Sequence, residues 1–261
     1  MPASPSPRPH VLREATYRQL LDAPPAVALL PWGATEAHNY HLPHGTDIFE
    51  SEAVAEEAAG LAAARGARAI VLPGIPFGNN AQQQDQAATI HLQTTTALAI
   101  LRDVVASLLR QGIDRLIIVN AHGGNEFKPV VRDLMLEFSV TILVVDFWKI
   151  RPDLMAEIFT EPGDHAGELE TSLMLHLRPE LVMLEEAGPG ERLPHGLAAM
   201  KPCGAWTPRP WSKVHPDTGS GDPRGATAEK GAAYFKAITE ELAALIVEFA
   251  DERTASNRSG G

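Results

Sequence analysis

The chain has 261 residues, a formal net charge of −11 and one cysteine, Cys203. The length suits one α/β domain with a large core, and the negative charge argues against nucleic acid or an anionic membrane surface as a partner. A single cysteine excludes a disulfide framework and a thiolate zinc cluster. Residues 1–10 lack a signal-peptide core and no apolar run has transmembrane length, so we expect a cytoplasmic protein.

The predicted elements alternate between strand and helix along the chain. The strands are short apolar runs that do not alternate with polar residues, as in a parallel sheet covered on both faces. The order of elements therefore predicts an α/β layer fold with right-handed crossovers. The predicted strands are 26–30, 69–72, 115–119 and 141–145, and the predicted helices are 48–65, 95–110, 129–138 and 228–249.

The domain organisation is predicted to be simple. A flexible segment, 1–12, precedes a single domain over 13–252, and a flexible tail follows over 253–261. Two long segments within the domain, 73–92 and 186–225, lack a regular pattern. Long loops in a compact domain are usually functional or disordered, and the tryptophans of the second segment favour an ordered wall of a pocket or a subunit contact.

Potential metal ligands gather directly after the first predicted strand. Glu36, His38 and Asp47 lie in one polar loop there. Imidazole and carboxylate are the ligands that divalent transition metals prefer, and the carboxyl ends of strands are where open α/β sheets place their active sites. A polar turn with solvated histidines is the alternative, but the density of ligands favours a metal site.

A second polar loop follows the predicted strand 115–119. It contains His122, and Gly123 and Gly124 would allow a ligand or metal to approach the backbone closely. An ordinary strand–turn–helix junction and a phosphate-binding turn are the alternatives, but the chain has no phosphate-loop lysine. Because both loops follow interior strands, we expect His122 to join the first cluster.

A third group of polar residues surrounds His165. The leucine spacing predicts a helix that starts near His165, on which His165 and Glu168 lie about 60° apart and Glu170 about 140° from His165. We therefore assign Glu168 as a metal ligand, His165 as an acid/base and Glu170 as a structural acceptor. The alternative is that all three are charges favoured in a first helical turn by the helix dipole.

Together these motifs resemble the creatininase (creatinine amidohydrolase) family. A fourth piece looks like the family's C-terminal signature, and the resemblance spans nearly the whole chain. It rests on residues 31–38, 41–43, 45–47, 120–125, 165–172 and 221–231. The resemblance implies a three-layer α/β/α sandwich with a mostly parallel central sheet, and a homo-oligomer that is often a hexamer.

The resemblance also implies a dinuclear site with two divalent ions per subunit, zinc paired with zinc, manganese or iron. One ion would take Glu36, Asp47 and His122. The other would take His38, a bridging Asp47 and a further glutamate.

The further glutamate is where this chain departs from creatininase proper. Gly124 stands at that position, and Glu168 is the expected replacement. Asn39 and Tyr40 also replace the small residue usual after the histidine, which suggests an altered pocket. Creatinine itself is therefore not the expected substrate.

The expected activity is hydrolysis of a small cyclic substrate, a cyclic amide or lactam, by attack of a metal-activated water on a carbonyl carbon. His165, oriented by Asp164, would protonate the leaving group. Ring-opening C–C hydrolysis of a keto-cyclitol and a creatininase-like peptidase or maturation role are alternatives within the fold. A non-catalytic binding protein is the competing class, and the complete set of candidate ligands argues against it.

The substrate is expected to contact side chains from the loops around this site. We assign substrate binding to Tyr40, Asn80, Gln84 and Trp206. The first follows the metal loop, the next two come from the segment 73–92, and the tryptophan comes from 186–225.

Overall fold

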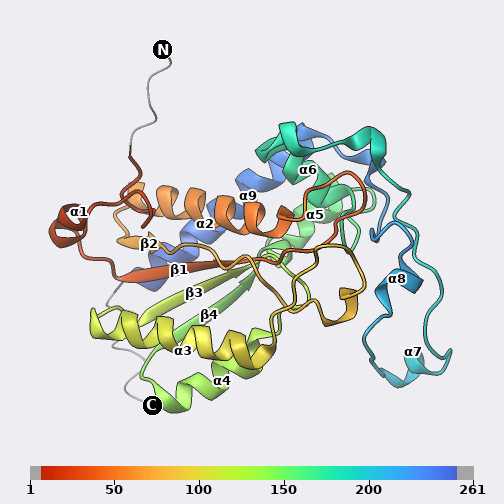
Figure 1. Ribbon diagram of the computed structural model, residues 1–261. Helices are drawn as coiled ribbons and strands as arrows, with labels where there is room; N and C mark the ends of the chain where they lie inside the picture. The colour runs from red at the N-terminus through yellow and green to blue at the C-terminus, as the bar shows by residue number, and fades with distance from the viewer. Residues whose placement is uncertain (1–6, 252–261) are drawn as a thin grey trace.

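A four-stranded parallel sheet forms the centre of the computed structural model, which describes residues 7–251 (Figure 1). Every predicted strand is present, with ends that differ from the prediction by at most two residues. The strand order is β2-β1-β3-β4, and all neighbours are parallel. The strands are β1 (Val27–Trp32), β2 (Ala69–Val71), β3 (Arg115–Asn120) and β4 (Thr141–Asp146).

Helices cover both faces of this sheet, so the predicted α/β/α sandwich is confirmed (Figure 1). α3 and α4 lie on one face, and α2, α6 and α9 lie on the other. Within residues 7–251 no helix is both long and apolar enough to cross a membrane. The helices are α1 (Tyr17–Asp22), α2 (Thr46–Ala64), α3 (Thr94–Arg110), α4 (Phe127–Glu137), α5 (Pro152–Ile158), α6 (Glu168–Leu177), α7 (Met200–Cys203), α8 (Trp211–Val214) and α9 (Ala228–Ala250).

The absence of polar alternation in the strands follows from this layering. In β1, Val27 and Leu29 pack into the core beneath α2 and α9. Ala28 and Leu30 pack into the core beneath α3 and α4. Successive side chains point to opposite faces of a strand, and both faces here are apolar cores. Every residue of β1 is therefore buried.

The sheet brings the two polar loops together, as the sequence predicts. β1 and β3 are neighbours, and Trp32 at the end of β1 is in register with Asn120 at the end of β3. Ala121 N also donates a hydrogen bond to Trp32 O at 3.0 Å. The loops that follow the two strands therefore start side by side.

The prediction of a flexible N-terminal segment is wrong for residues 7–12. The chain there lies along β2, with Val71 N donating to His10 O at 2.8 Å and Leu12 N donating to Val71 O at 2.9 Å. Arg8 forms an ion pair with Glu56 of α2 at 2.7 Å. The low hydropathy of the segment gave no sign of these long-range backbone bonds. The predicted flexible tail, 253–261, lies outside the described residues.

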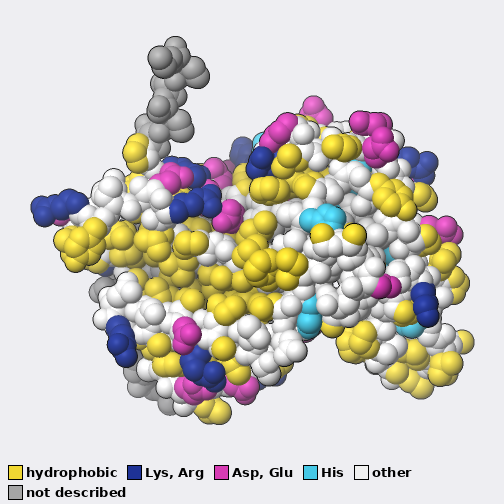
Figure 2. All heavy atoms as spheres, in the orientation of Figure 1, with side chains coloured by type: hydrophobic (Ala, Val, Ile, Leu, Met, Phe, Trp, Pro, Cys, Tyr) yellow, Lys and Arg dark blue, Asp and Glu magenta, His cyan; other side chains and the backbone are white. Residues whose placement is uncertain are grey.

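Apolar side chains are exposed near the edge of the sheet that β2 forms. Figure 2 shows hydrophobic atoms over α1 and over the strip between α2 and α3. Tyr17 and Leu21 of α1 and Phe77 of the loop after β2 are exposed. Contiguous exposed apolar surface commonly marks a contact with another protein.

The packing of α9 against α6 depends on Gly231. A Cβ at this position would lie 1.9 Å from Ser172 O of α6. We expect Gly231→Ala to lower the free energy of unfolding by about 2 kcal/mol, because the backbone clash outweighs the better helix propensity of alanine. Gly60→Ala in α2 is the matched control, since its new methyl meets only the His10 side chain at 3.2 Å. Urea unfolding measures both, and equal stability of the two variants would contradict the prediction.

Candidate metal centre

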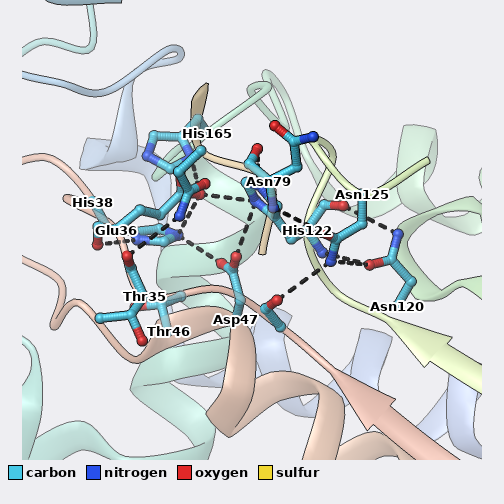
Figure 3. A network of polar contacts seen from close by, with 12 residues as sticks. Thr35, Glu36, His38, Thr46, Asp47, Asn79, Asn120, His122, Asn125 and His165 are labelled. Atoms are coloured by element: carbon cyan, nitrogen blue, oxygen red, sulfur yellow. Dashed lines mark hydrogen bonds and ion pairs between the residues drawn. The ribbon is translucent and has the colours of Figure 1, made fainter. Parts of the chain in front are cut away.

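Three histidines from three separate loops are held in one tautomer each by the backbone (Figure 3). In each ring one nitrogen faces a carbonyl oxygen, which can only accept a hydrogen bond, so that nitrogen carries the proton. The pairs are His38 Nδ1 with Glu36 O at 3.1 Å, His122 Nε2 with Asn79 O at 3.2 Å, and His165 Nε2 with Ala37 O at 2.7 Å. The second nitrogen of each neutral ring is therefore an acceptor.

Those acceptor nitrogens point at buried carboxylates. His38 Nε2 lies 2.8 Å from Asp47 Oδ1, and His122 Nδ1 lies 3.0 Å from Glu36 Oε1 and 3.2 Å from Asp47 Oδ2. All four side chains are buried. Two acceptors at hydrogen-bond distance repel each other unless a metal cation or a proton lies between them. This donor set, imidazole nitrogens and carboxylate oxygens with the far side of each ring hydrogen-bonded, fits a divalent transition metal.

Without a metal ion, protons balance this charge. Burial acts to lower the pKa of His38, but Asp47 overrides it and raises that pKa to about 10. Burial likewise opposes the charged form of His122, and Glu36 and Asp47 still hold its pKa well above the usual range. The pKa of Asp47 is lowered, because the attraction of His38 and His122 exceeds the cost of burial. The site is thus built around positive charge.

Glu170, and not Glu168, brings a third carboxylate to the cluster. Ligand atoms of His38, Asp47 and Glu170 lie within 4.8 Å of one another. Glu168 Oε1 instead forms an ion pair with Lys230, and its Oε2 accepts from Glu161 N at 2.9 Å. This geometry therefore places Glu170 with the candidate ligands instead of the predicted Glu168, while Glu170 is also the structural acceptor that was predicted.

The error lies in where the helix begins. α6 starts at Glu168, so His165 is outside it and the helical angles do not apply to that residue. Ala166 has a φ of 50°, in the left-handed region, and Gly167 is extended. This turn rotates His165 relative to the helix. Glu170 also accepts a hydrogen bond from Ala166 N, which closes the turn.

No side chain fits at Gly124, the position of the glutamate in creatininase proper. A Cβ there would lie 2.3 Å from Asn79 O and 2.5 Å from His122 Nε2. The backbone carbonyl of Asn79, which fixes the tautomer of His122, occupies this space. A carboxylate must therefore reach the second position from elsewhere, and α6 supplies one in Glu170.

Asp164 does not orient His165, contrary to the prediction. Asp164 Oδ2 accepts from Arg209 Nη1 at 2.6 Å, and 56% of its side chain is exposed. The Ala37 carbonyl orients the imidazole instead. His165 Nδ1 faces the cluster, 3.6 Å from Glu36 Oε1.

A cavity of about 410 Å³ opens onto the cluster. Glu36, His122 and His165 line it, which gives a ligand access to the metal-ligating side of the site. The segment 204–211 forms a further wall, as predicted for the long loop that carries the tryptophans. Its lining members are Trp206, Thr207, Pro208, Arg209 and Trp211.

Of the four predicted substrate contacts, only Trp206 lines this cavity, with 82% of its surface exposed. Tyr40 is 62% exposed and lies outside the lining. Asn80 is buried and donates to Thr35 O and Ile90 O, so it shapes its own loop. Gln84 is exposed and donates to Asn80 O. The structure thus leaves these three outside the cavity lining, because loop polarity does not show which way a side chain points.

Gln83 is a site residue that the sequence analysis did not select. It is buried, and its Nε2 donates to Glu36 Oε2. This bond leaves the other oxygen of Glu36 for His122. The run of three glutamines marked the loop as polar, but only the short 3₁₀ turn Ala81–Gln83 selects the middle one.

The comparisons with known proteins agree with this geometry. The family model for creatininase, creatinine amidohydrolase, matches residues 12–246. This chain belongs to the creatininase family. It is therefore a hydrolase, and the fold and donor set fit a metal-dependent one.

Several relatives match over most of their length. Creatinine amidohydrolase of Pseudomonas putida is 28% identical over 89% of this chain and 93% of its own. The mycofactocin precursor peptide peptidase of Mycobacterium tuberculosis H37Rv is 31% identical, with 88% of each chain covered. A solved Bacteroides fragilis structure named for creatinine amidohydrolase has a TM-score of 0.88, 42% identity, and 94% and 98% coverage.

Creatininase structures with bound metals share the fold. A manganese form has a TM-score of 0.72 and 24% identity, and covers 92% of this chain and 98% of its own. A zinc–zinc form of a creatininase variant has a TM-score of 0.73 at 23% identity, with the same coverage. At these identities the likeness concerns the fold.

The metal content of variants distinguishes the roles of the two glutamates of α6, Glu168 and Glu170. We expect Glu170→Gln to lower the number of ions bound per subunit by about one, because a ligand of the His38 group is lost. Glu168→Gln, the matched control two residues away, should keep the ion count and lose only its contact with Lys230. Elemental analysis of protein dialysed against zinc or manganese measures both, and a deficit in Glu168→Gln alone would restore the original assignment.

The free energy of unfolding of this protein should fall in mild acid because of His41. This side chain is buried, its Nε2 lies 2.8 Å from Thr171 Oγ1, and burial is the main cause that lowers its pKa to about 4. Folding keeps the ring neutral while the unfolded chain binds a proton near pH 6.5. The contribution of neutral His41 to stability is therefore fully present above about pH 6.5 and is lost as the pH falls toward 4.

Urea unfolding of the metal-free protein between pH 7 and 4 measures this loss. We expect His41→Asn to be less stable at pH 7 but to lose less stability over the interval than the parent chain. Parallel losses in the two proteins would show that His41 does not cause the acid sensitivity.

Proposed function

We propose that this hydrolase opens the ring of a small cyclic amide by adding water to its carbonyl carbon. The observation that carries the proposal is the set of three backbone-fixed histidines turned toward buried carboxylates at an accessible cavity. A binding protein needs no such concentration of acceptors. The family supplies the reaction class, and the cavity of about 410 Å³ suits a small ring.

We infer that the site takes two divalent ions, zinc with zinc, manganese or iron. Glu36, Asp47 and His122 would hold one ion, and His38, Asp47 and Glu170 the other. The two oxygens of Asp47 face different histidines, which suits a bridging carboxylate. Such ions lower the pKa of water and polarise a carbonyl group. The manganese and zinc–zinc forms of creatininase support this choice of metals.

His165 is the proposed acid/base. Its Nε2–H is fixed on Ala37 O, so Nδ1 is the nitrogen that can accept a proton from water and return it to the leaving nitrogen. The edge of Trp211 packs against its ring, with centroids 5.2 Å apart and planes at 85°. This contact and the carbonyl hold the imidazole in one orientation at the cavity.

A peptidase is the second candidate. Curated relatives named mycofactocin precursor peptide peptidase are 28–31% identical to this chain, as close as the creatinine amidohydrolase at 28%. The same proton transfers would serve a linear amide. A peptide would need to extend from the cavity along the segment 204–211, which forms one wall.

We also propose that the chain assembles as a homo-oligomer, a hexamer by family resemblance. The exposed apolar side chains over α1 and beside the β2 edge, including Tyr17 and Leu21, offer a contact surface (Figure 2). Light scattering of the purified protein tests this, and a monomer at micromolar concentration would reject it.

Turnover by metal-loaded protein tests the reaction class. The panel contains lactams and other cyclic amides, oxidised inositols and short peptides. We expect ring opening of a cyclic amide, and His165→Asn should lower kcat by about 10²–10⁴-fold with the ion count unchanged. His176→Asn, an exposed imidazole on α6, is the matched control and should keep full activity.

Two results would redirect the proposal. Cleavage of peptides without hydrolysis of any cyclic amide would favour the peptidase. Loss of an ion in His165→Asn would make His165 a ligand, since its ligand atom also lies within 4.8 Å of those of Glu36 and His38.

A further inference from the structure

We propose that Arg209 binds a carboxylate of the substrate, so that the site selects amides bearing an anionic group. The inference rests on the proposed hydrolase function, and it adds the class of substrate. It starts from the wall of the cavity that faces the metal cluster, where Arg209 is the one Lys or Arg among the described lining residues.

The guanidinium of Arg209 lies on an aromatic platform. Its Cζ is 4.4 Å from the centroid of the Trp211 ring. Trp211 is buried, and its indole N–H donates to Thr218 O at 2.8 Å, so the platform itself is fixed. A guanidinium stacked in this way keeps its in-plane N–H groups available for hydrogen bonds. The charge is thereby held in place before a ligand arrives.

Within residues 7–251, only one nitrogen of this guanidinium has a hydrogen-bond partner. Nη1 donates to Asp164 Oδ2 at 2.6 Å and lies 3.5 Å from His215 Nε2. Over residues 7–251, Nε and Nη2 have no hydrogen-bond partner. Arginine carries five N–H donors in a planar fork that matches the two oxygens of a carboxylate. The unused edge of Arg209 therefore offers an anion subsite.

The subsite is close to the proposed chemistry. Trp211 contacts Arg209 through its ring face and His165 through an edge-to-face contact. A substrate that reaches both Arg209 and the metal cluster would thus span one indole ring. A small amide with its carboxylate a few bonds from the scissile carbonyl meets this requirement, whereas a neutral ring leaves the guanidinium edge unpaired.

The competing explanation is that Arg209 only ties the segment 204–211 to Asp164. The ion pair is partly exposed, with 22% of the Arg209 side chain and 56% of the Asp164 side chain accessible. A partly exposed pair contributes little to stability. The two explanations differ in what removal of Asp164 does. If Arg209 is only a tether, replacing Arg209 or replacing Asp164 breaks it equally. If Arg209 forms an anion subsite, replacing Asp164 instead frees Nη1 and removes a negative charge near the bound anion.

The test uses two matched pairs of probes on the full, metal-loaded chain. Dihydroorotate differs from dihydrouracil by one carboxylate, and a tripeptide with a free C-terminus differs from its amide in the same way. Binding is followed by tryptophan fluorescence, because Trp211 lies against Arg209. We expect at least one acid to bind about 10-fold or more tightly than its neutral counterpart.

Variants then test whether Arg209 causes that preference for the acid. Arg209→Met should abolish it, Arg209→Lys should keep part of it, and Asp164→Asn should strengthen binding of the acid. Lys213→Met is the matched control, because Lys213 is an exposed cation of α8 outside the cavity lining and its loss should change nothing. Thermal unfolding of each variant shows whether the fold is kept.

Three results would overturn the inference: no preference for either acid, a preference that survives Arg209→Met, or equal weakening by Arg209→Met and Asp164→Asn. Turnover is scored separately from binding. An Arg209-dependent preference without hydrolysis of any probe would leave the subsite standing and reject the proposed reaction, so the two failures are distinguishable.

Discussion

The unfavourable approach of acceptor atoms at the carboxyl ends of β1 and β3 is the constraint on which the site depends. Asp47 sits between His38 Nε2 and His122 Nδ1, and backbone carbonyls fix the N–H of each neutral ring on its other nitrogen. Such an arrangement is stable only when positive charge lies among the acceptors, either as metal ions or as protons on His38 and His122. The fold therefore prepares a site for positive charge, because neutral rings cannot donate to these carboxylates.

The carboxylates of the site also affect a buried acid in the core beneath it, Glu50. Glu50, one helical turn after Asp47 in α2, is fully buried, and neither of its oxygens has a partner within the described residues. Burial, Glu170 and Asp47 raise its pKa well above the usual range, which favours the neutral form of this carboxyl. A neutral carboxyl limits the negative charge that the ions must balance. The core beneath the site thus takes part in its electrostatics.

The long segment 186–225 is ordered because it is tied to the metal loop. The Asn39 side chain donates to Gly188 O and accepts from Gly188 N, and Asn39 N donates to Thr218 Oγ1. Asn39 adopts a φ of 54°, a left-handed conformation that asparagine tolerates. These bonds place Trp211 and Arg209 over the cavity. Asn39, which stands where the family usually has a small residue, thus holds the wall that lines the pocket.

The sequence by itself determined the layered α/β fold and the clustering of Glu36, His38, Asp47 and His122. It could do so because buried strands have a readable apolar pattern, and parallel strands end at one edge. Only the tertiary structure decided that Glu170 joins them, that residues 7–12 extend the sheet and that Arg209 faces the cavity. Those outcomes depend on one left-handed turn before α6 and on contacts between residues far apart in the chain, which no local periodicity records.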